Sequence, residues 1–172
     1  MTSISKEENN LKIRKAALSE LAAVMQVIDK ARLQMRQDGN ATQWSNGYPQ
    51  LQLMAEEITR GHCYIALYED RIVATFCLVE GPDPTYTSIE GAWLNDAPYH
   101  VIHRMASDGS LRGIGSRCIE WCRRQCGTDL RIDTHADNHR MQRVVTRAGF
   151  TRCGIIYVSD GSPRLAYQLT QA

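Results

Sequence analysis

Apolar residues recur at a spacing of three and four along the segment that follows Ser19. This spacing places them on one face of a helix, and Gly39 lies just beyond that segment. We therefore predict a helix with Ser19 as its N-cap and Gly39 as its end, preceded by a strand over 11–17. The apolar face consists of Leu21, Val24, Met25, Val27, Ile28 and Ala31.

A different pattern, short runs rich in β-branched, aromatic and other apolar residues, predicts strands. The runs 62–68 and 71–80 flank a tight Glu69-Asp70 turn, which indicates an antiparallel hairpin. Apolar runs and helical patterns continue along the rest of the chain. They predict strands over 101–106, 129–134, 151–157 and 163–169, and helices over 51–59, 113–125 and 138–147.

The order of these elements predicts the fold class. Antiparallel strands come first, one strand–helix–strand crossover follows, and strands close the chain. We expect one α/β (α+β) domain over 11–172, with a mixed and mostly antiparallel sheet flanked by about four helices. Residues 1–10 are mostly polar, and we expect them to form a disordered arm.

Composition narrows the class of partner. The chain has 172 residues, 43% of them hydrophobic, which suffices for one sizeable core. Lys and Arg total 20 against 19 acidic residues, so a net charge of +1 offers no field that attracts nucleic acid or a membrane surface. The longest apolar run, 72–79, is far shorter than the ~20 residues of a membrane-spanning helix. We expect neither nucleic acid nor a membrane as partner.

The chain has six cysteines. We recognise no signal peptide, because the first ten residues have no apolar core. We therefore expect reduced thiols and a cytoplasmic protein. Cys118, Cys122 and Cys126 recur at every fourth position of one predicted helix, a spacing that could hold a soft metal ion. Free cysteine more often packs as a small hydrophobe, so we expect no metal site.

Two connections between predicted elements carry aromatic side chains. Trp44 and Tyr48 lie in a turn-rich loop before the second predicted helix, and Tyr86 and Trp93 lie in the long connection 81–99. Aromatic residues in loops either anchor the loop or line a ligand pocket, and long connections in small domains are often functional. These four residues are our candidates for the wall of a substrate pocket.

A glycine-containing loop joins the strand over 101–106 to the next helix. Gly113 and Gly115 open that helix, where backbone N–H groups favour an anion and a Cβ would keep phosphate oxygens away. A P-loop is excluded because the chain has no Gly-Lys pair. A dinucleotide site stays an alternative, with Asp133 as its acid, although Cys118 replaces the third glycine. The remaining candidate is the pyrophosphate of coenzyme A.

Two motifs favour coenzyme A. The stretch Ser110-Leu111-Arg112-Gly113-Ile114-Gly115 precedes one helix, and Asn138 begins a later helix that ends at Gly149-Phe150. In this combination the chain resembles the GNAT superfamily of acetyl-CoA-dependent N-acetyltransferases over roughly 11–169. That family places Gln or Arg where this chain has Ser110, and often a tyrosine acting as general acid where it has Val145. The resemblance implies that Arg112 substitutes for the missing phosphate contact.

The resemblance also implies how the coenzyme binds. The sheet is expected to split between its central strands, with the pantetheine arm of acetyl-CoA inserted there and an amine attacking the thioester directly in a ternary complex. Backbone groups of one strand bind pantetheine, the helix start binds pyrophosphate, and Asn138 holds the coenzyme while also serving as an N-cap. The implied coenzyme-binding residues are Met105, Ala106, Ser107, Arg112, Gly113, Ile114, Gly115, Ser116 and Asn138.

Such a reaction needs a base for the acceptor amine, and two residues are candidates. Glu90 lies in the long connection, and His103 lies on the strand before the glycine loop. Imidazole takes up a proton near neutral pH, although a surface glutamate and a packed histidine are the ordinary alternatives. His135 and Asp137 rank lower because they also fit a turn and cap cluster.

The acceptor class stays open at this point, since small-molecule and peptide amines both fit. The competing class is a non-catalytic module that binds coenzyme A as a sensor or assembly partner, and the departures at Ser110 and Val145 favour it. The final strands of the resembling family often make dimer contacts, so a homodimer is a candidate assembly.

Overall fold

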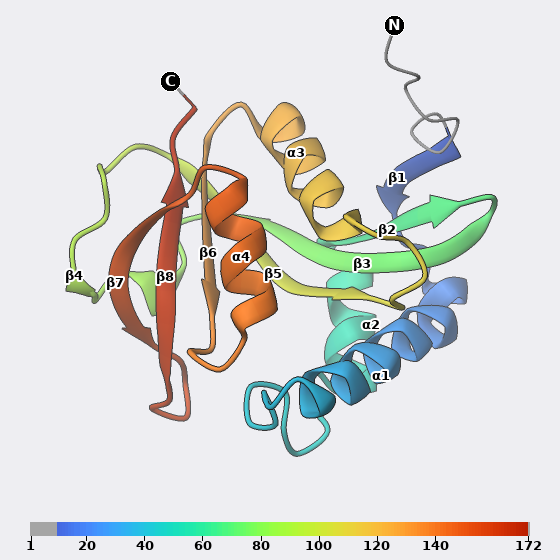
Figure 1. The fold of residues 1–172 in the computed structure, drawn as a ribbon. Coiled ribbons are helices and arrows are strands. Elements are labelled where there is room, and N and C mark those ends of the chain that lie inside the picture. The colour runs from blue at the N-terminus through green and yellow to red at the C-terminus, as the bar shows by residue number, and fades with distance from the viewer. Residues whose placement is uncertain (1–9, 172) are drawn as a thin grey trace, which may run out of the picture.

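The strands form one sheet in the order β1-β2-β3-β5-β6-β8-β7-β4 (Figure 1). The computed structural model describes residues 10–171, so the arm expected over 1–10 lies outside the described residues except for its last one. Neighbouring strands run antiparallel apart from β5 and β6, which are parallel. The strands are β1 (Leu11–Lys15), β2 (Cys63–Tyr68), β3 (Arg71–Glu80), β4 (Glu90–Gly91), β5 (Tyr99–Ser107), β6 (Asp129–Thr134), β7 (Thr151–Tyr157) and β8 (Pro163–Leu169).

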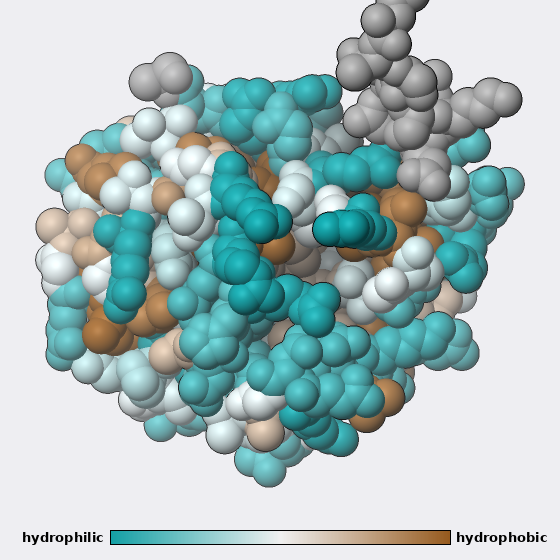
Figure 2. Space-filling view, viewed as in Figure 1, coloured by the Kyte–Doolittle hydropathy of each residue, from teal (hydrophilic) through white to brown (hydrophobic). Residues whose placement is uncertain are grey.

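Four helices cover the sheet, two on each face. They are α1 (Leu21–Gln37), α2 (Leu51–Thr59), α3 (Ile114–Cys126) and α4 (His139–Arg147). The alternation of side chains along β2 decides which core each residue enters: Cys63 and Ile65 pack with α1 and α2, whereas Ala66 packs with α3 and α4. Figure 2 shows hydrophilic side chains over the outer surface of α1 and α4, as one-sided burial of these helices requires.

The predicted elements agree with the observed ones within a few residues, and the single α/β domain with four helices is confirmed. Two local details differ. β1 ends at Lys15, before its expected end, and Ser19 is not a helix cap because it lies inside a 3-10 turn, η2 (Leu18–Glu20), that precedes α1. The carboxylate of Glu20 caps this turn instead, since it accepts a hydrogen bond of 2.8 Å from the N–H of Ala17.

The sheet is split at its centre. β5 pairs with β6 only where Tyr99–Val101 lie opposite Asp129–Arg131. Beyond these three pairs the strands diverge, because β5 continues to Ser107 and β6 to Thr134 without facing each other (Figure 1). This divergence leaves backbone groups of both strands free to bind a ligand.

A β-bulge in β5 lies beside the split. Two residues of β5, Arg104 and Met105, lie opposite a single residue of β3, Phe76. Arg104 has φ +52°, in the left-handed region that residues with a side chain rarely occupy. Backbone conformations of this kind cluster at functional sites, which directs attention to the cavities on either side of β5.

The cysteines of α3 pack in the core. Cys118 and Cys122 are fully buried between the helix and the sheet. Burial raises the pKa of Cys118 to about 12 and that of Cys126 to about 11, which favours the thiol over the thiolate that binds metals. Within residues 10–171, no cluster of His, Cys, Asp and Glu could hold a metal ion, and no helix is long and apolar enough to cross a membrane.

Candidate active site

Two cavities adjoin the split in the sheet. The first, of about 710 Å³, lies over the glycine loop and the starts of α3 and α4. The second, of about 440 Å³, lies between the loop over 42–50, β5, β6 and the β7–β8 turn. Met35, Met105, Asn138 and Met141 line both, so the two cavities meet at these side chains. We refer to them as the coenzyme cavity and the acceptor cavity.

The coenzyme cavity contains the start of α3. Gly113 lies just before the helix with φ +75°, a conformation that glycine adopts without strain. A Cβ added at Gly113 would meet no atom within 4 Å, so the space above the loop is open to a ligand. All nine coenzyme-binding residues expected from the sequence line this cavity, and the donor set at a helix start suits a pyrophosphate.

Ser110 and Arg112 differ in what they offer an anion. The Ser110 hydroxyl donates to Asp108 at 2.5 Å and accepts from Nη2 of Arg71 at 3.1 Å, so it is occupied within the loop. Arg112 is exposed, lines the cavity, and makes no hydrogen bond or ion pair with any residue of the described chain. Its guanidinium is therefore available for a phosphate.

Asn138 joins the two cavities through a hydrogen-bond network. Its Oδ1 accepts from the N–H of Met141 at 3.0 Å, which makes it the N-cap of α4, and its Nδ2 donates to Oε1 of Gln43 at 3.0 Å. The same Gln43 oxygen accepts from Nδ2 of Asn40 at 2.9 Å and from the hydroxyl of Thr134 at 3.4 Å. Gln43 thus links a loop, β6 and α4 where the cavities meet.

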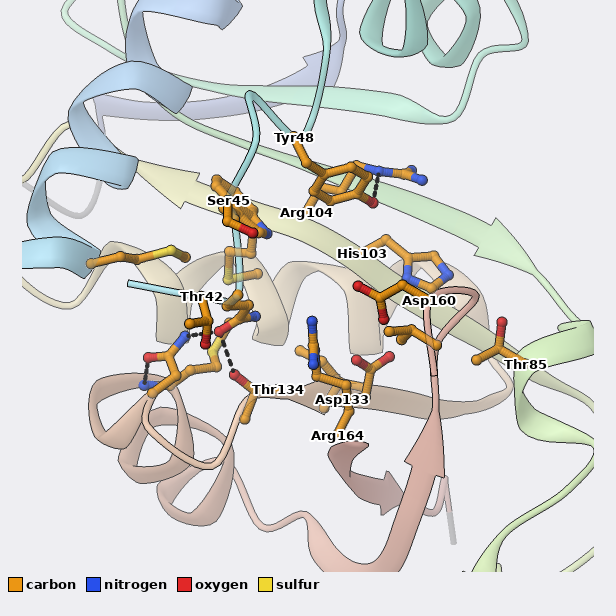
Figure 3. A pocket seen from close by; sticks show the side chains of 18 of the residues that line it. Thr42, Ser45, Tyr48, Thr85, His103, Arg104, Asp133, Thr134, Asp160 and Arg164 are labelled. Carbon is orange, nitrogen blue, oxygen red and sulfur yellow. Dashed lines mark hydrogen bonds between the residues drawn. The ribbon is translucent and has the colours of Figure 1, made fainter. Parts of the chain in front are cut away.

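His103 lines the acceptor cavity and is held by Asp83. The distance from Nε2 of His103 to Oδ2 of Asp83 is 3.0 Å, and the other carboxylate oxygen accepts from the N–H of Thr85 at 2.8 Å. The hydrogen bond from His103 lowers the pKa of Asp83, with a smaller contribution from Thr85, and burial opposes them. The carboxylate is therefore charged at neutral pH and orients the imidazole. Figure 3 shows His103 among the side chains that line this cavity.

A second carboxylate, Asp133, lines the same cavity from β6. The hydroxyl of Tyr86 donates to its Oδ2 at 2.6 Å. Burial raises the pKa of Asp133, and the hydrogen bond from Tyr86 partly opposes this rise. Tyr86 itself is 2% exposed and lines neither cavity, so it supports the acceptor cavity from behind instead of forming its wall.

Trp44 and Tyr48 line the acceptor cavity, as expected from the sequence. The Tyr48 hydroxyl accepts from Nε of Arg104 at 2.9 Å, and Arg104 also pairs with Glu57 at 3.6 Å. Arg32 fixes the loop by donating to three of its backbone carbonyls, including that of Tyr48. These contacts tie the bulge of β5 to the aromatic loop.

Glu90 and Trp93 lie away from both cavities, which corrects the expectation for these two residues. Glu90 is exposed on β4, at the sheet edge, where it accepts a hydrogen bond of 2.9 Å from the Tyr157 hydroxyl. Trp93 packs over the guanidinium of Arg131 and donates to the carbonyl of Tyr86. Pairing of β4 with β7 carries this part of the connection to the far edge of the sheet.

Five charged side chains of the acceptor cavity were not assigned to it from the sequence: Asp83, Arg104, Asp133, Asp160 and Arg164. They come from four separate segments of the chain, and only Asp160 and Arg164, in the β7–β8 hairpin, lie close together in the sequence. Of the lower-ranked candidates, Asp137 lines the coenzyme cavity, and His135 is hydrogen-bonded to Thr42 at 3.1 Å. Val145 is fully buried in the core.

The chain belongs to the acetyltransferase (GNAT) family, whose model matches residues 28–150. Members of this family transfer acetyl groups, and acetyl-CoA is their acetyl donor. The resemblance seen in the glycine loop and around Asn138 is therefore confirmed. No curated protein sequence matches the chain.

Solved structures agree with this assignment. A GNAT-family acetyltransferase from Streptococcus agalactiae 2603 is 28% identical, with a TM-score of 0.86 over 94% of this chain and 96% of that one. A putative acetyltransferase from Staphylococcus aureus Mu50 has 18% identity and a TM-score of 0.70, over 93% of this chain and 99% of that one. The putative acetyltransferase yncA from Salmonella typhimurium, solved with its cofactor acetyl-CoA, has 15% identity and a TM-score of 0.63, with 95% of each chain covered. The last two share the fold.

Proposed function

We propose that the protein is an N-acetyltransferase that moves the acetyl group of acetyl-CoA to the amine of a small molecule, by direct attack in a ternary complex. The observation that carries this proposal is the meeting of two cavities at Met105 and Asn138, with a His103–Asp83 pair in the acceptor cavity. One cavity suits a coenzyme and the other a separate acceptor, as a ternary complex requires.

The chain's own residues fit the coenzyme. Arg112 and the backbone N–H groups at the start of α3 suit the pyrophosphate, and the open space above Gly113 leaves room for it. Met105, Ala106 and Ser107 belong to the part of β5 that has left β6, so their backbone groups suit the pantetheine amides. When bound, acetyl-CoA supplies an acetyl thioester that is activated toward amines.

His103 is the proposed base. Asp83 holds its Nε2, so Nδ1 is the atom that takes the proton from the acceptor ammonium, and the carboxylate stabilises the imidazolium that forms. The loop over 42–50 and the bulge of β5 line the cavity, where they would shield the reacting amine from water. No side chain is assigned as general acid, so solvent protonates the coenzyme thiolate that is released.

The test is thiol release from acetyl-CoA across a panel of primary amines, followed by mass spectrometry of the acetylated product. We expect acceptor-dependent release for the native protein and a loss of about 100-fold or more in kcat for His103→Gln. Coenzyme binding, followed by thermal shift, should be retained in that variant. Coenzyme binding without release for any amine would instead favour the non-catalytic binding module.

A further inference from the structure

The acceptor cavity contains a buried cation that forms no ion pair with any described residue. Arg164 lies on β8, is 8% exposed, and lines the cavity beside Asp133 (Figure 3). Its Nη1 donates to the carbonyl of Pro163 at 2.9 Å. Within residues 10–171, no carboxylate oxygen lies within 4 Å of its guanidinium nitrogens, so the charge is not neutralised by an ion pair.

The carboxylates that line the same cavity have other partners. Asp83 is bound by His103, and Oδ2 of Asp133 accepts from the Tyr86 hydroxyl. Asp160, in the β7–β8 turn, accepts from the N–H of Ser162 at 2.8 Å. The positive charge of Arg164 favours the ionised forms of Asp133 and Asp160, yet neither aspartate forms an ion pair with it.

A buried guanidinium without an ion pair has donors available for an anion from outside the chain. Arginine does not lose its proton in proteins, and a buried charge without a partner is costly. Its forked donor set matches a carboxylate, which it can bind through two parallel hydrogen bonds. The cavity volume of about 440 Å³ suits one small molecule.

We propose that the acceptor is an amino acid or another small amine that carries a carboxylate, with the carboxylate bound by Arg164 and the amine directed to His103. Acetylation of this acceptor rests on the proposed function, whereas binding of its carboxylate by Arg164 does not. A diamine or polyamine is the competing class, because three aspartates line the cavity. Arg164 would repel the second ammonium of such a molecule, and the aspartates are already hydrogen-bonded.

The experiment compares amino acids with the amines that decarboxylation would give. The pairs are L-phenylalanine with phenethylamine, L-leucine with 3-methylbutylamine, L-lysine with cadaverine, and β-alanine with ethylamine. For the preferred pair we expect kcat/KM to be at least about tenfold higher for the carboxylate-bearing member. Arg164→Gln should lower kcat/KM for that member by about 30-fold or more and leave its amine counterpart within about threefold.

Arg152→Gln is the matched control, because Arg152 is exposed on β7 and lines neither cavity. It should keep the native preference. If Arg164→Gln does not fold, the assignment is tested with Arg164→Lys and with the ratio of kcat/KM values that the native protein shows within each pair. Equal or better use of the decarboxylated amines by the native protein would overturn the assignment.

Calorimetric titration of the same pairs, in the presence of coenzyme A, separates the two proposals. Binding of a carboxylate-bearing member that is lost in Arg164→Gln, without turnover, would support Arg164 and overturn the proposed catalysis. Turnover of amines with no preference for a carboxylate would support the proposed catalysis and overturn the role of Arg164. Binding of the decarboxylated amine as tightly as its amino acid would also overturn the Arg164 assignment.

Discussion

Nε2 of His103 on β5 lies 3.0 Å from Oδ2 of Asp83, which belongs to the connection that follows β3. The hydrogen bond from His103 lowers the pKa of Asp83, so this carboxyl stays ionised through the neutral range. Its interaction with the imidazole stabilises the fold above the ordinary carboxyl pKa and is lost as the pH falls through the lowered value. The pair is thus intact wherever the proposed reaction runs.

Asp83→Asn tests this relationship. The imidazolium would lose its anionic partner, so we expect kcat to fall by about 10- to 100-fold and the acidic limb of the pH–rate profile to move to lower pH. Asp96→Asn is the control, since Asp96 is an exposed carboxyl of the same connection that lines neither cavity. A reduced kcat with an unmoved profile would assign Asp83 a structural role only.

Gly113→Val is expected to weaken coenzyme binding by about tenfold or more, because a branched side chain would fill the open space above the start of α3. Gly161→Val gives a matched comparison: Gly161 has φ +82°, its Cβ would also meet no atom within 4 Å, and it lines neither cavity. Both substitutions should cost about 1–2 kcal/mol of stability, as left-handed positions do. Similar coenzyme affinities, measured by calorimetry, would contradict the binding role of the glycine loop.

Gln43→Leu should destabilise the protein by about 1–3 kcal/mol, because its Oε1 accepts hydrogen bonds from Asn40, Thr134 and Asn138 and the three donors would be left without it. Gln52→Leu, an exposed position of α2, should change stability by less than about 0.5 kcal/mol. Urea denaturation of both variants measures the difference. Equal stability of the two variants would mean that the network adds little to folding.

Cys118 predicts a specific alkaline loss of stability. Burial raises its pKa to about 12, whereas the thiol ionises in the unfolded chain near its ordinary value of about 8.5. The unfolded state therefore binds fewer protons above that value, and the free energy of unfolding falls by about 1.4 kcal/mol between about pH 7.5 and 9.5. Cys118→Ala removes this contribution, so its unfolding free energy should depend less steeply on pH than that of the native protein. Parallel pH profiles for the two would refute the buried-thiol account.

The fold and the coenzyme cavity could be predicted because their signals are local. Hydrophobic periodicity marked the helices and strands, and Met105 to Ser116 is one continuous stretch from β5 to α3. The start of α1 was assigned wrongly, because Ser19 lies inside the turn η2. The Glu20 carboxylate caps that turn through the N–H of Ala17, a contact that the sequence does not reveal.

The acceptor cavity could not be predicted in the same way. Glu90 and Asp83 are both acidic residues of the connection between β3 and β5, and composition does not distinguish them. Glu90 pairs with Ile155 and therefore lies at the sheet edge. Asp83 lies next to His103 because the turn over Pro84–Tyr86 follows it. Arg164 has no sequence signal either, because its role depends on the folded structure leaving it buried without an ion pair.

The three residue pairs between β5 and β6 have a mechanical consequence. Among residues 10–171 they are the only backbone pairing between two groups of strands, one of β1, β2, β3 and β5 and the other of β6, β8, β7 and β4. The two groups are therefore connected over a short stretch of the sheet. A coenzyme bound in the split would contact both groups of strands and hold them together for as long as it stays bound. Loading the protein with acetyl-CoA should therefore slow amide exchange on the facing edges of both strands, far beyond the atoms that the ligand touches.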